Sequence, residues 1–118
     1  MVDSPDGAQR RRHFRLPYPT SDQPVLEAGD VQHRVIEIAE GGIRVILKPS
    51  TQLQLDEEIS GVIQFRGEHA ENVSGHVLRI DIQHVVVQLD KGISQQRVMQ
   101  EQAYLRKKYP NFLRNPRT

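Results

Sequence analysis

The 118-residue sequence has no cysteine and no tryptophan, and it holds only three tyrosines and three phenylalanines. The absence of cysteine excludes disulfide bonds, thiolate metal sites and cysteine nucleophiles. The scarcity of aromatic side chains disfavours the stacking platforms on which proteins bind single-stranded nucleic acids. No hydrophobic run has the length of a membrane span or the pattern of a signal peptide. We therefore expect a cytoplasmic protein that does not insert into a membrane.

The chain also lacks an excess of charge of one sign, because 16 lysines and arginines face 15 aspartates and glutamates. A net charge of +1 argues against nucleic-acid binding driven by bulk charge. Positive charge is concentrated near the two ends, over residues 10–15 and again over 106–108, Arg114 and Arg117. Such local patches favour a small anionic ligand or a limited docking surface.

The densest of these patches is the stretch RRRHFR at residues 10–15, which carries four guanidinium groups. Each guanidinium presents a planar fork of donors that matches phosphate oxygens or the edge of a purine. A second pattern, acid-x-small-x-x-Gly, follows about twenty residues later between two strand-like runs. It consists of Glu37, Ala39 and Gly42.

Alternating and β-branched apolar residues predict short antiparallel strands through the middle of the chain. In the fourth long run we expect Leu78, Ile80 and Ile82 to share one face, and we expect a polar connection over 66–72 before it. Five or six such strands, joined by short turns, predict a small β-barrel. The predicted strands cover 31–38, 43–47, 59–65, 77–82 and 85–89, with a shorter one beginning at Val25.

A single helix is predicted from about Gln95 to Lys108, after the composition changes at Gly92. Ser94 can cap its N-terminus, and Pro110 ends it. We expect the helix to lie over one opening of the barrel with a face formed by Val98, Met99, Gln102, Leu105 and Tyr109.

These features divide the chain into a disordered tail (1–9), one domain (10–110) and a C-terminal tail (111–118). Within the domain, the arginine motif covers 10–15, the barrel about 24–90 and the helix about 94–109.

Together these features resemble the PilZ domain family over nearly the whole chain. In that family an Arg-x-x-x-Arg segment precedes a six-stranded barrel, and an Asp/Asn-x-Ser-x-x-Gly motif lies on a strand and turn of the barrel. The resemblance implies an all-β dominated fold, with a small six-stranded antiparallel barrel and a C-terminal helix that closes it. It also implies cyclic di-GMP as the ligand, no cofactor, and a partner protein that receives the signal.

The resemblance assigns ligand contacts to the arginine segment. Arg11 and Arg15 match the Arg-x-x-x-Arg spacing and inherit the phosphate- and guanine-binding roles. Arg10 and Arg12 flank them as auxiliary contacts.

The resemblance likewise assigns barrel contacts to Glu37, Ala39 and Gly42. Glu37 replaces the family's Asp or Asn and carries its carboxylate on a longer arm, whereas Ala39 replaces Ser and has no hydroxyl to donate. One such missing hydrogen bond weakens binding by about 1 kcal/mol, or more if a ligand group is left unpaired, which is roughly five- to tenfold. Arg79 lies on a late strand, and two alternatives remain for it: it borders the ligand and stacks on a base, or it is a solvent-facing strand residue.

No catalytic motif, P-loop or metal-ligand spacing is present, so we expect no enzyme and no metal site. The leading hypothesis is a bacterial receptor for cyclic di-GMP, in signalling that controls motility or biofilm formation. The alternative is a PilZ-fold adaptor that does not bind the nucleotide. A third hypothesis, a nucleic-acid-binding barrel that uses both basic ends, predicts steep salt dependence and tolerance of any polyanion.

Overall fold

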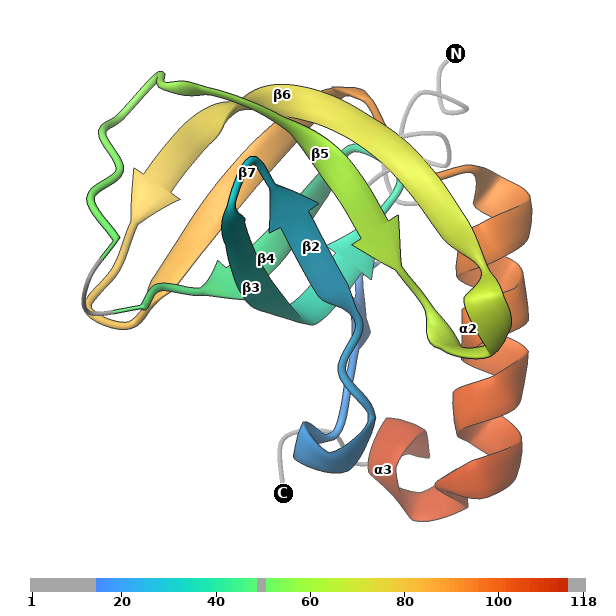
Figure 1. Cartoon of the computed structure of the whole chain (residues 1–118). Helices are drawn as coiled ribbons and strands as arrows, with labels where there is room; N and C mark the ends of the chain where they lie inside the picture. Colours follow the sequence, from blue (N-terminus) through green and yellow to red (C-terminus); the bar gives the residue numbers. More distant parts are fainter. Residues whose placement is uncertain (1–14, 49–50, 115–118) are drawn as a thin grey trace, which may run out of the picture.

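A computed structural model of the chain describes residues 15–48 and 51–114 (Figure 1). The predicted disordered tail, 1–9, and the arginines at 10–12 lie outside the described residues. In the described part of the chain, no helix is long and apolar enough to cross a membrane.

Seven antiparallel strands form one sheet, in the order β1-β3-β2-β5-β6-β7-β4, and a further pairing of β3 with β4 closes it. The six strands β2 to β7 make the barrel, and β1 adds to β3 outside the ring. The predicted six-stranded antiparallel barrel is therefore confirmed, with one strand more than expected. The strands are β1 (Leu16–Pro17), β2 (Val25–Ala28), β3 (Val31–Ala39), β4 (Gly42–Ile46), β5 (Glu58–Gln64), β6 (Ala70–Ile80) and β7 (His84–Lys91).

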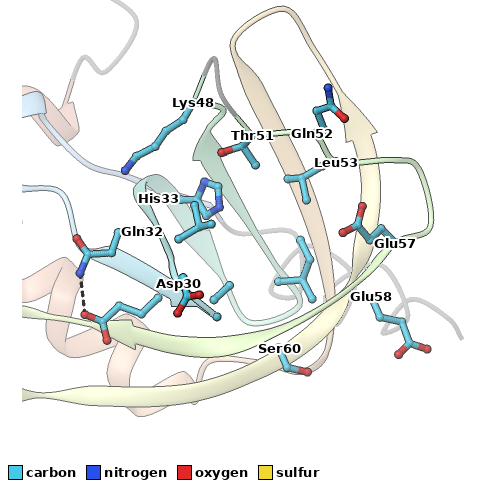
Figure 2. A pocket seen from close by; sticks show the side chains of 15 residues that line it. Asp30, Gln32, His33, Lys48, Thr51, Gln52, Leu53, Glu57, Glu58 and Ser60 are labelled. Atoms are coloured by element: carbon cyan, nitrogen blue, oxygen red, sulfur yellow. Dashed lines mark hydrogen bonds between the residues drawn. The ribbon is translucent and has the colours of Figure 1, made fainter.

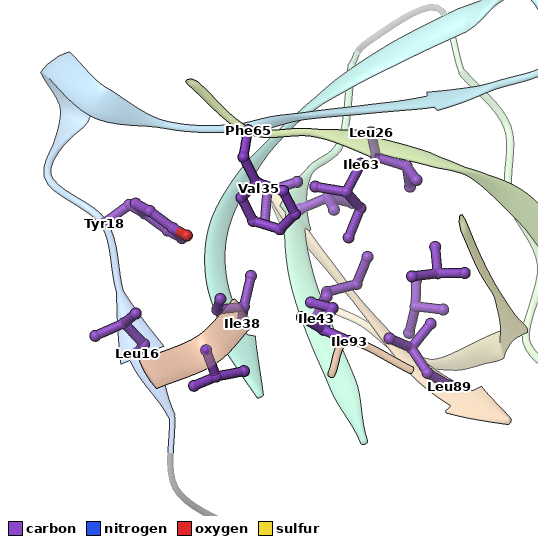
Figure 3. Close-up of a cluster of buried hydrophobic side chains, with 14 of the residues drawn as sticks. Leu16, Tyr18, Leu26, Val35, Ile38, Ile43, Ile63, Phe65, Leu89 and Ile93 are labelled. Atoms are coloured by element: carbon purple, nitrogen blue, oxygen red, sulfur yellow. The ribbon is translucent and has the colours of Figure 1, made fainter. Parts of the chain in front are cut away.

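The core fills the inside of the barrel with aliphatic side chains from alternate strand positions, as period two requires (Figure 3). Val85, Val87 and Leu89 of β7 all face inward, as the alternation predicts. Ile63 on β5 is fully buried, and Phe65, just beyond the end of that strand, is buried beside it.

Helix α2 (Gln95–Lys108) has the predicted bounds, and the Ser94 side chain caps it by accepting a hydrogen bond from the Arg97 backbone N–H. Val98 and Leu105 pack into the core at one end of the barrel, so the helix closes that end (Figure 1). Its buried face differs from the predicted one, because Met99 is exposed and Glu101 is buried instead.

A second short helix, α3 (Pro110–Arg114), begins at the proline that we expected only to end α2. Proline suits the first turn of a helix because its missing N–H would have no partner there. Two single 3-10 turns, η1 (Thr20–Asp22) and η2 (Arg66–Glu68), complete the described structure.

The prediction for β6 is wrong about where the strand begins and about which of its residues share a face. The strand begins at Ala70, inside the stretch expected to be a polar connection, and Val73 and Val77 face the core. A β-bulge between Val77 and Arg79 adds one residue and reverses the alternation. The bulge therefore places Leu78 and Ile80 on different faces: Leu78 is 53% exposed, whereas Ile80 packs against the core. Ile82, in the turn after β6, is 96% exposed.

Asp22, in the connection between β1 and β2, forms hydrogen bonds with side chains at the end of α2. Its Oδ2 accepts hydrogen bonds from the hydroxyls of Tyr104 at 2.7 Å and Tyr109 at 3.2 Å, and from Lys108 Nζ at 3.3 Å. Burial raises the pKa of this carboxyl, but the hydrogen bonds from these side chains outweigh the burial and lower the pKa below its ordinary value.

Candidate functional site

A hollow of about 470 Å³ on the barrel wall brings together the predicted site residues that the structure describes. It lies beside the β3–β4 turn and extends across β4 and β7 to β6. Arg15, Glu37, Ala39, Gly42 and Arg79 all line it. These residues come from three separate parts of the sequence, and the pairing of β1 with β3 and of β4 with β3 and β7 makes them neighbours.

Strand β1 explains how the arginine segment reaches the second motif. It pairs antiparallel with β3, so that Leu16 lies opposite Ile38 and Pro17 opposite Glu37. The backbone N–H of Tyr18 continues the pairing by donating to the Ile36 carbonyl at 2.9 Å. Arg15, which is exposed, immediately precedes β1 and so lies at the Ala39 end of β3.

Gly42 opens β4 directly after the turn, paired with Ala39 across the hairpin. A Cβ at this position would lie 3.1 Å from the Val87 carbonyl oxygen of β7. The neighbouring Gly41 has open space around it, and its carbonyl accepts a hydrogen bond from the Leu89 N–H at 2.9 Å. The motif glycine is thus explained by the close approach of β4 and β7.

Two β-bulges turn the charged residues of the site outward. In β3, Glu37 has the same parity as the buried Val35, but the register shift between them moves the Glu37 side chain to the outer face. In β6, Arg79 has the parity of the buried Val77, and the second bulge moves it outward in the same way. Without these bulges, both charges would point into the apolar core.

An ion-pair chain crosses this outer face. The carboxylate of Glu37 lies 3.6 Å from Arg44 Nε, and Arg44 Nη1 lies 3.2 Å from Asp81 Oδ2. The other carboxylate oxygen of Asp81 lies 3.5 Å from Arg79 Nε. Arg44 and Asp81 were not among the residues predicted from the sequence. The signal for Arg44 was its outward position between Ile43 and Val45 in the strand that opens with the motif glycine.

Charge makes the hollow suited to an anion. Three arginines line it, Arg15, Arg44 and Arg79. They outnumber the acidic side chains beside them, which are Glu37 in the lining and Asp81, the partner of Arg44 and Arg79. Leu78, on the outer face of β6, adds an exposed apolar side chain beside Arg79. Guanidinium forks beside an apolar surface can hold a phosphate and the flat face of a base together.

A second hollow, of about 990 Å³, lies by the β2–β3 turn and the start of β5 (Figure 2). None of the predicted site residues lines it. Its lining carries the carboxylates of Glu27, Asp30, Glu57 and Glu58 against the single ammonium of Lys48, so it is unsuited to an anionic ligand. Within the described ranges, no three His, Asp or Glu side chains are grouped to hold a metal ion.

The fold and the first hollow define a six-stranded β-barrel with an arginine-lined face beside its β3–β4 turn. The family model of the PilZ domain matches residues 9–107, and the chain belongs to that family. The resemblance drawn from the two motifs is thereby confirmed.

Two solved structures are similar to the chain in fold. An uncharacterized protein of Legionella has 17% identity and a TM-score of 0.57, with 81% of this chain and 97% of that one covered. The Bacillus subtilis inhibitor of motility (MotI/DgrA) has 19% identity and a TM-score of 0.58, with 85% of this chain and 51% of that one covered. No curated protein matches the sequence.

Proposed function

We propose that the chain is a receptor for cyclic di-GMP, in which residues 10–15 fold over the ligand and hold it against the barrel. In this proposal Arg11 and Arg15 contact its phosphates and guanine edges, with Arg10 and Arg12 as auxiliary contacts. The role is one of binding, and the molecule that this site receives is a ligand rather than a cofactor.

The observation that carries the proposal is the pairing of β1 with β3. Because Leu16 lies opposite Ile38, Arg15 lies beside the end of β3 and the β3–β4 turn. Arg15 and the motif residues there line the same hollow. An arginine segment with no ligand to bind would need neither this register nor a positively charged hollow beside it.

The composition of the hollow supports a dinucleotide. Cyclic di-GMP carries two phosphates, for which guanidinium groups are well suited, and two guanines, whose N7 and O6 accept from an arginine fork. Arg79 borders the hollow and can supply such a fork, while Ala39 and Gly42 present little side-chain bulk near the turn. The site thus combines anion attraction with room for a flat base.

A domain of this size transmits its signal through a partner protein in the cytoplasm. Ordering residues 10–15 over the ligand would change the surface that the barrel presents, and a partner would read that change. The fold shared with an inhibitor of motility makes motility a candidate process.

Calorimetric titration of cyclic di-GMP into the purified chain tests the proposal. We expect micromolar or tighter binding by the wild type and no measurable binding by the Arg11→Ala/Arg15→Ala double variant. The matched control is Arg106→Ala/Lys107→Ala, which removes two exposed charges from α2 and leaves the hollow intact. GTP serves as the ligand control.

The absence of binding up to millimolar ligand would overturn the receptor proposal. Equal loss of binding in the Arg106/Lys107 control would do the same, because it would indicate general charge attraction rather than a site.

The second candidate function is an adaptor that keeps the fold without binding the nucleotide. Ala39 favours it, since a hydroxyl that the family motif supplies is missing there. Comparison of partner capture by the wild type and the Arg11→Ala/Arg15→Ala variant, with and without cyclic di-GMP, distinguishes the two. An adaptor captures the same partner under every condition, whereas a receptor does so only in one ligand state.

A further inference from the structure

We infer that Arg44 and Arg79 form a pair of ligand-binding residues on the barrel itself, and that Glu37 is a positioning residue acting through Arg44. The inference rests on the proposed cyclic di-GMP site and assigns roles within it. In this inference the barrel wall binds the anionic ligand together with the arginine segment.

The strand register places these residues in one row across the barrel. Glu37 on β3 is the partner of Arg44 on β4, and Arg44 is the partner of Val86 on β7. Val86 is in turn the partner of Arg79 on β6. Directly paired residues of antiparallel strands point to the same side of a sheet. All four therefore share the outer face, and all four line the hollow.

This row sets the spacing of the two arginines. They lie two strands apart, which corresponds to about 10 Å between their backbones. Val86 lies between them and offers an apolar floor. Two arginines whose backbones flank an apolar residue match a ligand that carries anionic or acceptor groups beside a flat, partly apolar body.

Acidic partners hold the pair in place. Asp81 lies between the two arginines, 3.2 Å from Arg44 Nη1 and 3.5 Å from Arg79 Nε. Glu37 approaches Arg44 from the other side, 3.6 Å from its Nε. The Arg44 side chain is only 19% exposed, so it is held within the wall of the hollow rather than extended into solvent.

The remaining donors of Arg44 are the ones that can meet a ligand. Among the described residues, its polar contacts involve Nε and Nη1, which leaves the two N–H groups of Nη2 for an incoming acceptor. Glu37 directs its carboxylate to Arg44, so its effect on binding is transmitted by the position of that guanidinium. An aspartate would be one methylene shorter and would hold Arg44 less closely.

A double-mutant cycle on cyclic di-GMP affinity tests both roles. We expect Arg44→Met to weaken binding by about tenfold or more, the effect of losing a charged hydrogen-bond donor. Arg44→Lys should recover only part of the affinity, because it keeps the charge and loses the fork. Arg34→Met is the matched control, since it removes an exposed arginine from β3 that does not line the hollow.

The Glu37→Gln substitution then separates positioning from direct contact. In the wild-type background it should weaken binding severalfold, and in the Arg44→Met background it should have no further effect. An equal loss in both backgrounds would show direct contact with the ligand and would overturn the positioning role.

Wild-type affinity in Arg44→Met would overturn the inference alone and leave the receptor proposal standing. The absence of wild-type binding would overturn both. Thermal unfolding of each variant is measured alongside, so that a loss of affinity in a folded protein is distinguished from a loss of fold.

Discussion

The hydroxyl of Tyr18 donates a hydrogen bond of 2.7 Å to the Glu101 carboxylate, across a separation of 83 residues. Glu101 is 1% exposed, and Arg66 donates to both of its oxygens at 3.0 and 3.1 Å. Burial, followed by the charge of Glu101, raises the pKa of Tyr18 far above its ordinary value, so the hydroxyl remains a donor. Because Tyr18 lies directly after β1, this contact ties the segment that follows Arg15 to helix α2.

Replacing Tyr18 with phenylalanine should lower the free energy of unfolding by about 1–3 kcal/mol, because a buried charged acceptor loses a donor. The measurement is urea unfolding followed by circular dichroism. Tyr109→Phe is the control, since its hydroxyl makes longer and more exposed contacts and should cost less. Equal stability of Tyr18→Phe and wild type would contradict the role given to this bond.

Gly75 should tolerate no side chain, although alanine is a small change. A Cβ there would collide with the Gln88 carbonyl group and Leu89 Cα of β7, so β6 and β7 would have to move apart. We expect Gly75→Ala to lower the free energy of unfolding by about 1–3 kcal/mol, as overpacked sites do. Gly41→Ala is the matched control, with open space at its Cβ and no expected loss. Similar midpoints of urea unfolding for the two variants would refute the packing argument.

His33 should make the fold less stable as the pH falls below neutral. Burial lowers its pKa below the ordinary 6.5, and the nearby Lys48 acts in the same direction against a backbone hydrogen bond at Ile46. The unfolded chain therefore binds a proton at a pH where the folded chain does not. Stability contributed by the neutral imidazole is present above about pH 6.5 and declines as the pH falls towards the folded-state pKa.

The measurement for His33 is the difference in free energy of unfolding between wild type and His33→Leu from pH 7.5 to pH 5. The difference should change steadily in favour of the variant as the pH falls. His69→Leu, at an exposed position, is the matched control variant. A constant difference for His33→Leu across the range would contradict the prediction.

Ala39→Ser should strengthen the binding of cyclic di-GMP at the proposed site. The substitution supplies a hydroxyl on the wall of the hollow, and one hydrogen bond of about 1 kcal/mol corresponds to roughly a fivefold gain. Calorimetric titration measures the change, with Ala103→Ser on the exposed side of α2 as the control. Unchanged or weaker affinity in Ala39→Ser would show that position 39 does not contact the ligand.

Local patterns predicted several elements well because the physics that forms them is local. The bounds of α2 follow from the Ser94 cap and the proline two residues beyond its end. The inward residues of β7 follow from strict alternation in a strand without a bulge at its centre. The error in β6 arose because a bulge changes the parity of a strand, and nothing in the apolar pattern marks where the extra residue lies.

Some residues of the site were likewise predicted from local patterns, and others were not. Arg15, Glu37, Ala39 and Gly42 were found from motif spacing, and the hollow brings them together with Arg79. Arg44 and Asp81 belong to no motif, and their contribution depends on the register of β4 and on the turn after β6.

The sequence by itself determined that this chain is a small antiparallel barrel with one capped helix and an arginine segment, because strand alternation, helix capping and charge density act over a few residues. The tertiary structure alone decided which of those residues share a surface. Two bulges, between Val35 and Glu37 and between Val77 and Arg79, turn charged side chains out of the core. The pairing of β4 with both β3 and β7 then places Arg44 between Glu37 and Arg79, since strand pairing joins residues that the sequence keeps far apart.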